Sequence, residues 1–177
     1  MKTIWLMLVA VIGLWSCASC AEEATCALQL DGPSVRGLPF GEREEAVQLT
    51  ELGFRKLTRA EVLEEELVFA AGDVFKSDIA YVIFSEQGRL QMIYIPDAQR
   101  LCADGVPVAT VAPEVFATLL GPSRDYYVSS LDVYTFTEGD IEVAAQHSED
   151  GFVAVGFTHL GILREDMSPR ITQPLAP

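Results

Sequence analysis

One arrangement of elements occurs twice along the chain, and this recurrence constrains the fold more than any other feature. In its first occurrence three apolar residues are spaced three apart: Ala46, Leu49 and Leu52. This spacing predicts a short helix that ends at Gly53. The segments 65–75 and 79–95 are rich in β-branched and aromatic side chains and predict strands, and Glu86-Gln87-Gly88 predicts a hairpin turn within the second of them.

The second occurrence begins at Pro113, because proline is favoured at the first position of a helix. Gly121-Pro122 ends this predicted helix. Its apolar face consists of Val115, Phe116, Leu119 and Leu120. Three strands are predicted after it, at residues 131–136, 140–146 and 151–160, with turns at Glu138-Gly139 and at Glu149-Asp150-Gly151.

The strands come in hairpins rather than one per helix, which favours an α+β fold over an α/β fold. We therefore expect two tandem helix-plus-antiparallel-hairpin units, at residues 27–100 and 101–165, that share one core. The proline-rich residues 166–177 predict a flexible tail. Segments 81–84 and 152–155 are apolar at every position, so we expect them to be covered on both faces or to lie centrally in a larger sheet.

Residues 1–21 predict an export signal. Lys2 precedes an apolar run over residues 4–15, and small residues follow it. Such a run is too short to span a bilayer as a helix and is typical of the apolar part of a secretory signal. We expect an exported protein of the periplasm or cell envelope, with secretion as the alternative.

The cysteines connect the processing of this signal to a disulfide. Cleavage after Ala21 leaves Cys26 and Cys102, an even pair that predicts one disulfide in an oxidising compartment. Acylation of Cys20 leaves the same pair, whereas acylation of Cys17 leaves three cysteines and one without a partner. We favour cleavage near Ala21, and a lipid anchor on Cys20 or Cys17 is the alternative.

The chain is strongly acidic, with 12 basic and 26 acidic residues. Removal of the signal removes Lys2 and leaves 11 basic against 26 acidic residues, a formal charge of −15. This charge repels nucleic acid and anionic membrane surfaces, so membrane contact is expected only through a lipid anchor. A protein partner with a basic face is favoured, although the charge can also serve only solubility.

Short turn motifs in both units resemble a known family. In the second unit they are Leu120-Gly121-Pro122, Val133-Tyr134-Thr135-Phe136 and Asp150-Gly151-Phe152-Val153. In the first unit they are Pro39-Phe40-Gly41-Glu42, Leu52-Gly53 and Gln87-Gly88-Arg89-Leu90. This pattern resembles the envelope modules of the SmpA/OmlA lipoprotein type and, more distantly, the tandem repeats of β-lactamase inhibitor protein. The tryptophan that this family has before its tyrosine strand is absent, and Val133 stands near that position. The resemblance implies the fold, an envelope location and a scaffold or inhibitor role.

The sequence offers few residues for catalysis or metal binding. Gly-x-Ser-x-Gly is absent, and a disulfide at Cys102 would remove that thiol as a nucleophile. His147 and His159 have no zinc ligands at a recognised spacing, so we interpret both as ordinary strand or surface histidines. Residues 64–66 are all glutamate but lack EF-hand spacing and predict a solvated acidic edge. We expect no metal and no cofactor.

The most distinctive loop spans residues 121–130 and contains Arg124, Tyr126 and Tyr127. Arginine and tyrosine are favoured at interface centres, so these residues are candidates for protein binding. The alternative is that one tyrosine packs inward and the other has no role. The sequence favours a non-catalytic protein that acts as an inhibitor, immunity factor or assembly accessory. The competing hypothesis is a small exported hydrolase with paired carboxylates, which requires a deep pocket that holds both acids.

Overall fold

The computed structural model describes residues 26–67, 70–121, 126–128 and 132–171. Its strands form an eight-stranded antiparallel sheet, the large sheet, and a four-stranded small sheet. In spatial order the large sheet consists of β3 (Arg55–Lys56), β4 (Val74–Lys76), β5 (Tyr81–Phe84), β6 (Leu90–Ile95), β12 (Gly151–His159), β11 (Ile141–Ser148), β10 (Val133–Glu138) and β9 (Tyr126–Val128). The small sheet consists of β2 (Ser34–Val35), β1 (Leu28–Asp31), β7 (Leu101–Ala103) and β8 (Val106–Pro107).

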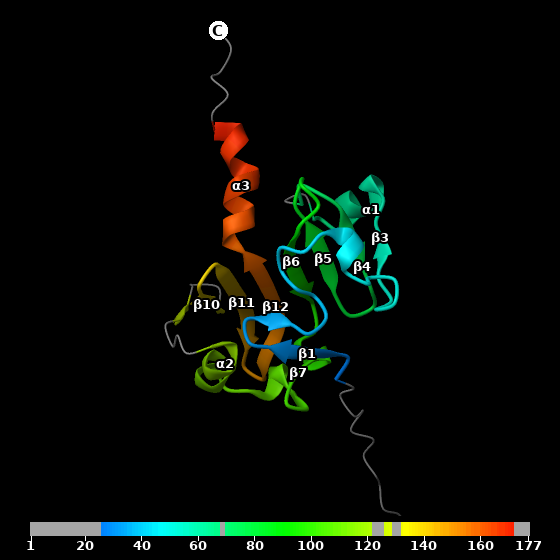
Figure 1. Ribbon diagram of the computed structural model, residues 1–177. Coiled ribbons are helices and arrows are strands. Elements are labelled where there is room, and N and C mark those ends of the chain that lie inside the picture. Colours follow the sequence, from blue (N-terminus) through cyan, green and yellow to red (C-terminus); the bar gives the residue numbers. More distant parts are fainter. Residues whose placement is uncertain (1–25, 68–69, 122–125, 129–131, 172–177) are drawn as a thin grey trace, which may run out of the picture.

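The helices are short and lie outside the large sheet. They are α1 (Arg59–Glu64), α2 (Pro113–Leu120) and α3 (Leu160–Ile171), with 3-10 turns η1 (Glu44–Ala46), η2 (Ala98–Arg100) and η3 (Val108–Thr110). In Figure 1, α2, β1 and β7 lie below the large sheet and α3 extends upward from the end of β12. The predicted α+β class is confirmed.

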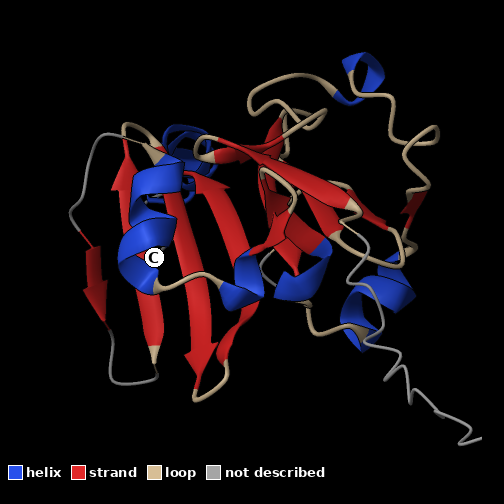
Figure 2. Cartoon of the chain, turned by 90° about the horizontal axis from the view of Figure 1, so that it is seen from below, coloured by secondary structure: helices blue, strands red, loops and turns tan. Residues whose placement is uncertain are grey.

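The strand order of the large sheet is built from its two halves. Strands β3 to β6 run from one edge to the centre, and β9 to β12 run from the other edge to the centre. The two halves meet where β6 pairs antiparallel with β12, with Tyr94 opposite Gly156. Figure 2 shows the two groups of strands side by side and inclined to each other. Each predicted unit therefore supplies half of one continuous sheet.

A single main core covers one face of this sheet and includes residues from both halves. Phe116 of α2 packs against Phe136 and Phe152, with ring centroids 5.3 and 5.1 Å away. A smaller cluster lies on the other face beneath α1, where Val62 contacts a group that includes Val74 and Ile83. Strand β5 is thus covered on both faces and β12 lies centrally in the sheet, in agreement with the expectation from their apolar sequences.

The helix predicted over residues 46–52 is wrong. Only η1 is helical there, because Val47 and Leu49 are both buried whereas Leu52 is 42% exposed. Val47 has extended dihedral angles and residues 49–53 form turns, so no continuous helix spans 46–52. Of the strand predicted over 65–75, the described residues form only the start of β4 (Val74–Lys76).

Helix α1 was not predicted, although the sequence contains its start signal. The Thr58 side chain accepts a hydrogen bond from the Glu61 backbone N–H, and the Glu61 carboxylate accepts one from the Thr58 backbone N–H at 2.7 Å. This reciprocal pair is a capping box, and it satisfies donors that the first helical turn leaves free.

The predictions for the second half are confirmed in their main features. Helix α2 begins at Pro113, and the turns at residues 138–140 and 149–151 connect β10, β11 and β12. The flexible tail was predicted from residue 166, but α3 continues to Ile171. Ile162 is buried and the backbone N–H of Ile162 donates to His159 Nδ1, so the first turn of α3 is held against the fold. Residues 172–177 lie outside the described part of the chain.

The predicted disulfide is present. Cys26 and Cys102 are joined by an S–S bond of 2.04 Å, which links the start of the described chain to β7. Beside it, β1 and β7 pair in parallel, with Gln29 opposite Cys102. None of the described helices has the length and apolar character needed to cross a membrane.

The open face of the large sheet as candidate functional site

The two faces of the large sheet have different surroundings. Along β10, β11, β12 and β6, side chains in the main core alternate with side chains that point to the opposite face. We call this opposite side the open face. Its residues on these four strands include Val133, Thr135, Thr137, Glu142, Ala144, Gln146, Ala154, Gly156, Thr158, Met92 and Tyr94.

A β-bulge aligns the small residues of the open face. Near the β11–β12 turn, His147 pairs with Phe152, but beyond it Gln146 pairs with Ala154, so Val153 has no partner on β11. This one-residue shift places Ala144 opposite Gly156. Val153 is 40% exposed, as expected for the extra residue of a bulge. The bulge therefore gathers Ala144, Ala154 and Gly156 on one side of the sheet.

These small residues form the floor of a depression, which we call the sheet depression. It has a volume of about 250 Å³ and is lined by Met92, Tyr94, Val133, Ala144, Gln146, Ala154, Gly156 and Thr158. All of these residues belong to β6, β10, β11 and β12, so no other described element contributes to its walls. The depression is thus a hollow in the surface of the sheet and not a gap between two layers.

A tyrosine pair continues the open face from β6 onto β5. The rings of Tyr94 and Tyr81 lie 6.1 Å apart, and Lys76 Nζ lies 5.1 Å from the centre of the Tyr81 ring. Glu65, just after α1, pairs with Lys76 and accepts a hydrogen bond from the Tyr81 hydroxyl at 2.6 Å. The hydrogen bonds from Lys76 and Tyr81 lower the pKa of Glu65, while partial burial and the bond to Glu65 raise the pKa of Tyr81. This network forms a charged wall beside the aromatic pair.

The charged residues in the segment that supplies β10, β11 and β12 all have one sign. Residues 132–159 contain six carboxylates and neither lysine nor arginine. Glu142 lies on the open face opposite Thr158, and it has no ion pair with any residue that the structure describes. Glu138 and Asp140 flank the β10–β11 turn, and Glu149 and Asp150 form the β11–β12 turn. A partner seated on this half of the sheet meets a negative potential.

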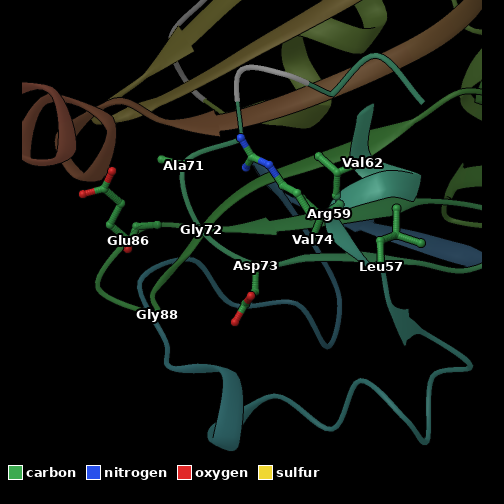
Figure 3. Close-up of a pocket in the computed structure, with 10 residues that line it drawn as sticks. Leu57, Arg59, Val62, Ala71, Gly72, Asp73, Val74, Glu86 and Gly88 are labelled. Atoms are coloured by element: carbon green, nitrogen blue, oxygen red, sulfur yellow. The ribbon is translucent and has the colours of Figure 1, made fainter. Parts of the chain in front are cut away.

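A larger cavity, of about 460 Å³, lies between α1, β4 and the β5–β6 turn. Figure 3 shows that the carboxylates of Asp73 and Glu86 point away from each other, and that the Arg59 guanidinium points in a third direction. Asp73 pairs with Lys56 at 2.6 Å. The two acids that line this cavity therefore do not converge on one point, as a paired-carboxylate hydrolase requires.

The sequence-predicted binding residues Tyr126 and Tyr127 lie at an edge of the large sheet. Arg124 is outside the described residues, and Tyr126 and Tyr127 are in β9, the edge strand. Their backbones pair with Phe136 and Thr135 of β10. The possible lipid sites Cys17 and Cys20 are also outside the described residues.

The two histidines have contacts within the fold. His147 packs between Tyr134 and Phe152, with ring centroids 5.4 and 5.1 Å away. His159 caps the first turn of α3 and lies 6.2 Å from the Phe40 ring. Within the described residues, no three His, Cys, Asp or Glu side chains come together in a way that could hold a metal ion.

Sequence reasoning missed the residues of the open face. The alternation of Glu142, Ala144 and Gln146 with buried neighbours was visible in the sequence of β11 and indicates a strand with one open side. The sequence does not reveal that Tyr94 of β6 lies beside Gly156. The end of β6 at Ile95 and the start of β12 at Gly151 are 56 positions apart in the sequence, and the two strands meet only through the β6–β12 pairing.

No protein-family model, characterised protein or solved structure matches this chain.

Proposed function

We propose that this chain is a non-catalytic binding protein whose open face receives another protein. The observation that carries this proposal is the sheet depression, an apolar hollow flanked by Tyr94 and Met92 that no described element covers. Tyrosine and methionine are enriched at protein interfaces, and contiguous apolar surface is uncommon on monomeric proteins unless it binds something.

The charge distribution supports a partner with a basic face. Six carboxylates and no basic residue lie between residues 132 and 159, the segment that supplies β10, β11 and β12. Attraction at long range accelerates association with a basic partner, whereas the apolar contacts slow dissociation. We expect that raising the salt concentration lowers the association rate far more than it changes the dissociation rate.

We place the protein in the periplasm or cell envelope, with secretion as the alternative. The Cys26–Cys102 disulfide supports an oxidising compartment, and the apolar run over residues 4–15 supports export. An inhibitor, immunity or assembly role fits a protein that binds another protein there. The resemblance of the turn motifs to SmpA/OmlA-type modules supports the same location.

Position-specific cross-linking tests the binding proposal. A photoreactive phenylalanine at Gln146, on the open face, should cross-link one defined protein in the native envelope. The same group at Val115, which is 51% exposed on α2, serves as the control on the opposite side. In the position-146 protein, Tyr94→Ala should reduce the cross-link, because loss of an aromatic anchor costs about 2 kcal/mol of binding energy.

Two results would contradict the binding proposal. One is equal cross-linking from positions 146 and 115, which indicates non-specific contact. The other is the absence of any protein cross-linked from position 146 under conditions where the protein is folded and correctly located.

The processed N-terminus is expected near Glu22, without a lipid. N-terminal sequencing and intact mass of the exported protein measure this directly. Incorporation of radioactive palmitate that disappears in Cys17→Ser or Cys20→Ser would show instead that the protein is anchored, and would identify the modified residue. A single acyl chain binds membranes only marginally, so stable anchoring would require the complete lipoprotein modification.

A further inference from the structure

We propose that the sheet depression is a socket for one arginine side chain of the partner. This proposal rests on the binding role proposed above and adds the chemistry by which the open face recognises its partner. Four properties of the depression support the proposal: the shape of its floor, its aromatic wall, its hydrogen-bond acceptors and the sign of the surrounding charge.

The floor accepts a flat group because its side chains are small. Ala144 and Gly156 are directly opposite each other, and Ala154 lies two residues before Gly156 on the same face, opposite Gln146. A Cβ at position 156 would lie 3.8 Å from Cδ2 of Tyr94, so the missing side chain of Gly156 leaves room beside the tyrosine ring. A hollow of about 250 Å³ suits one large side chain and is too small for a folded segment. The methylene stem of an arginine can cover such an apolar floor while its head stays near the rim.

The rim provides acceptors for the guanidinium group. Thr158 and Gln146 line the depression and carry a hydroxyl and an amide oxygen. Glu142 follows the floor along β11, two residues from Ala144 and on the same face, about 7 Å away by strand geometry. The guanidinium group has five N–H donors and no acceptor, so it can bond to several of these oxygens at once. It can also stack on the ring of Tyr94.

The same face already holds one cation in this manner. Lys76 Nζ lies over the Tyr81 ring at 5.1 Å and pairs with Glu65. Tyr81 and Tyr94 are neighbours on β5 and β6, and Glu142 offers a second carboxylate on the far side of Tyr94. The open face therefore also offers a tyrosine and a carboxylate at the depression, with Glu142 two strands from Tyr94, and residues 132–159 contain neither Lys nor Arg.

Arginine fits this site better than lysine or an apolar side chain. Its planar head stacks on an aromatic ring and is more weakly hydrated than an ammonium group, so it loses less on entering a half-buried site. An apolar side chain would cover the floor but would leave the Glu142 carboxylate without a partner beside an apolar surface, which is unfavourable.

Nuclear magnetic resonance with a single amino-acid probe tests the arginine socket. N-acetyl-arginine methylamide is titrated into the ¹⁵N-labelled protein purified after export, with the corresponding lysine, leucine and phenylalanine derivatives as competitors. We expect the arginine probe to shift the backbone amides of Ala144, Gly156 and Tyr94 and to bind more tightly than the other three probes. Equal or tighter binding of the leucine or phenylalanine probe, or no shift at these amides, would overturn the proposal.

Two matched variants separate the socket from general electrostatic attraction. Glu142→Gln should weaken the arginine probe about threefold to fivefold, the size expected for an exposed ion pair. Glu149→Gln makes the same charge change in the β11–β12 turn, away from the floor of the depression, and should weaken the probe much less. Equal weakening by both variants would show that only net charge matters and would overturn the socket.

A third variant, Ala144→Leu, fills the depression and should abolish the arginine-specific shifts, and its amide spectrum reports whether the fold is retained. Persistence of those shifts in folded Ala144→Leu would also contradict the proposal. Failure of the arginine probe leaves the cross-linking test of the open face unaffected, so the two proposals can fail separately.

Discussion

At the residue scale, Gly151 shows how closely two parts of the chain approach. Its φ is +124°, and a Cβ there would lie 2.0 Å from the backbone oxygen of Ala109. Ala109 belongs to η3 and is buried in the main core, so neither partner can move away without disturbing the packing. Glycine is required at this position for both backbone conformation and space.

Gly151→Ala should therefore destabilise the protein by more than about 3 kcal/mol, since it combines backbone strain with a clash against buried backbone. Gly139 is the matched control, because its φ is +59° and a Cβ there would meet nothing within 4 Å. Gly139→Ala should cost only about 1 kcal/mol, the ordinary penalty of a left-handed conformation. Urea unfolding of both variants measures the difference. Similar losses in the two variants would contradict the steric argument.

At the element scale, α1 is the helix that depends most on its cap. It has six residues, too few for an isolated helix to be stable in water. The capping box of Thr58 and Glu61 and the Arg55–Glu61 ion pair at 2.8 Å hold its first turn, and Val62 packs onto the smaller cluster. Helix α1 covers the β3–β5 end of the open face, so its stability determines where the uncovered part of that face begins.

The cap makes the contribution of Glu61 depend on pH. Hydrogen bonds from the backbone and side chain of Thr58, followed by that from Arg55, lower the pKa of Glu61 to about 2. A carboxyl group whose pKa is lower in the folded state than its unfolded value of 4.5 stabilises the folded state at pH values above 4.5. This contribution is lost as the pH falls from 4.5 toward 2. The difference in unfolding free energy between wild type and Glu61→Gln should therefore be largest at neutral pH and shrink between about pH 4.5 and pH 2.

Urea unfolding at several pH values measures this dependence. Glu64→Gln on the same helix is the control for the loss of one negative charge. If the difference between wild type and Glu61→Gln stays constant over this pH range, the capping carboxylate does not contribute as proposed.

At the scale of the whole molecule, the disulfide connects the start of the described chain to the segment between the two halves. Cys26 and Cys102 are 76 residues apart in sequence, and both flank the parallel β1–β7 pairing. Cys102 is fully buried and lies among the strands of the small sheet, beside residues of the main core. The bond thus closes a loop that contains the whole first half of the large sheet.

Replacing both cysteines with serine should lower the unfolding free energy by about 4 kcal/mol, the value that the chain-entropy relation gives for a loop of this length. Thermal or urea unfolding measures the loss. Reduction should lower the unfolding midpoint of the wild type toward that of the double variant and should not affect the double variant. A wild-type midpoint that is insensitive to reduction would contradict a stabilising role for the bond.

Local signals in the sequence determined several parts of this fold. Pro113 and the glycine after Leu120 define the limits of α2 because each acts on its own backbone. The hairpins joined at residues 86–88, 138–140 and 149–151 follow from turn residues between strand-forming segments. The Cys26–Cys102 pairing follows from parity if residues 1–21 are a cleaved signal, as the sequence predicts, and the disulfide is present. The same reasoning failed at residues 46–52, where alternate burial by the tertiary core outweighed the helical spacing.

The candidate site was decided by the tertiary structure. Counting back from the β11–β12 turn would place Ala144 opposite Val155, and only the bulge at Val153 brings it opposite Gly156. Tyr94 reaches the same hollow through the β6–β12 pairing, a long-range contact that no local pattern specifies. A turn or a helix end is determined by neighbouring residues, but strand register across a sheet depends on how the whole core packs. The sequence alone therefore determined the hairpins, helix α2 and the acidic charge, and the packing of the two halves determined where the small, aromatic and acidic side chains meet.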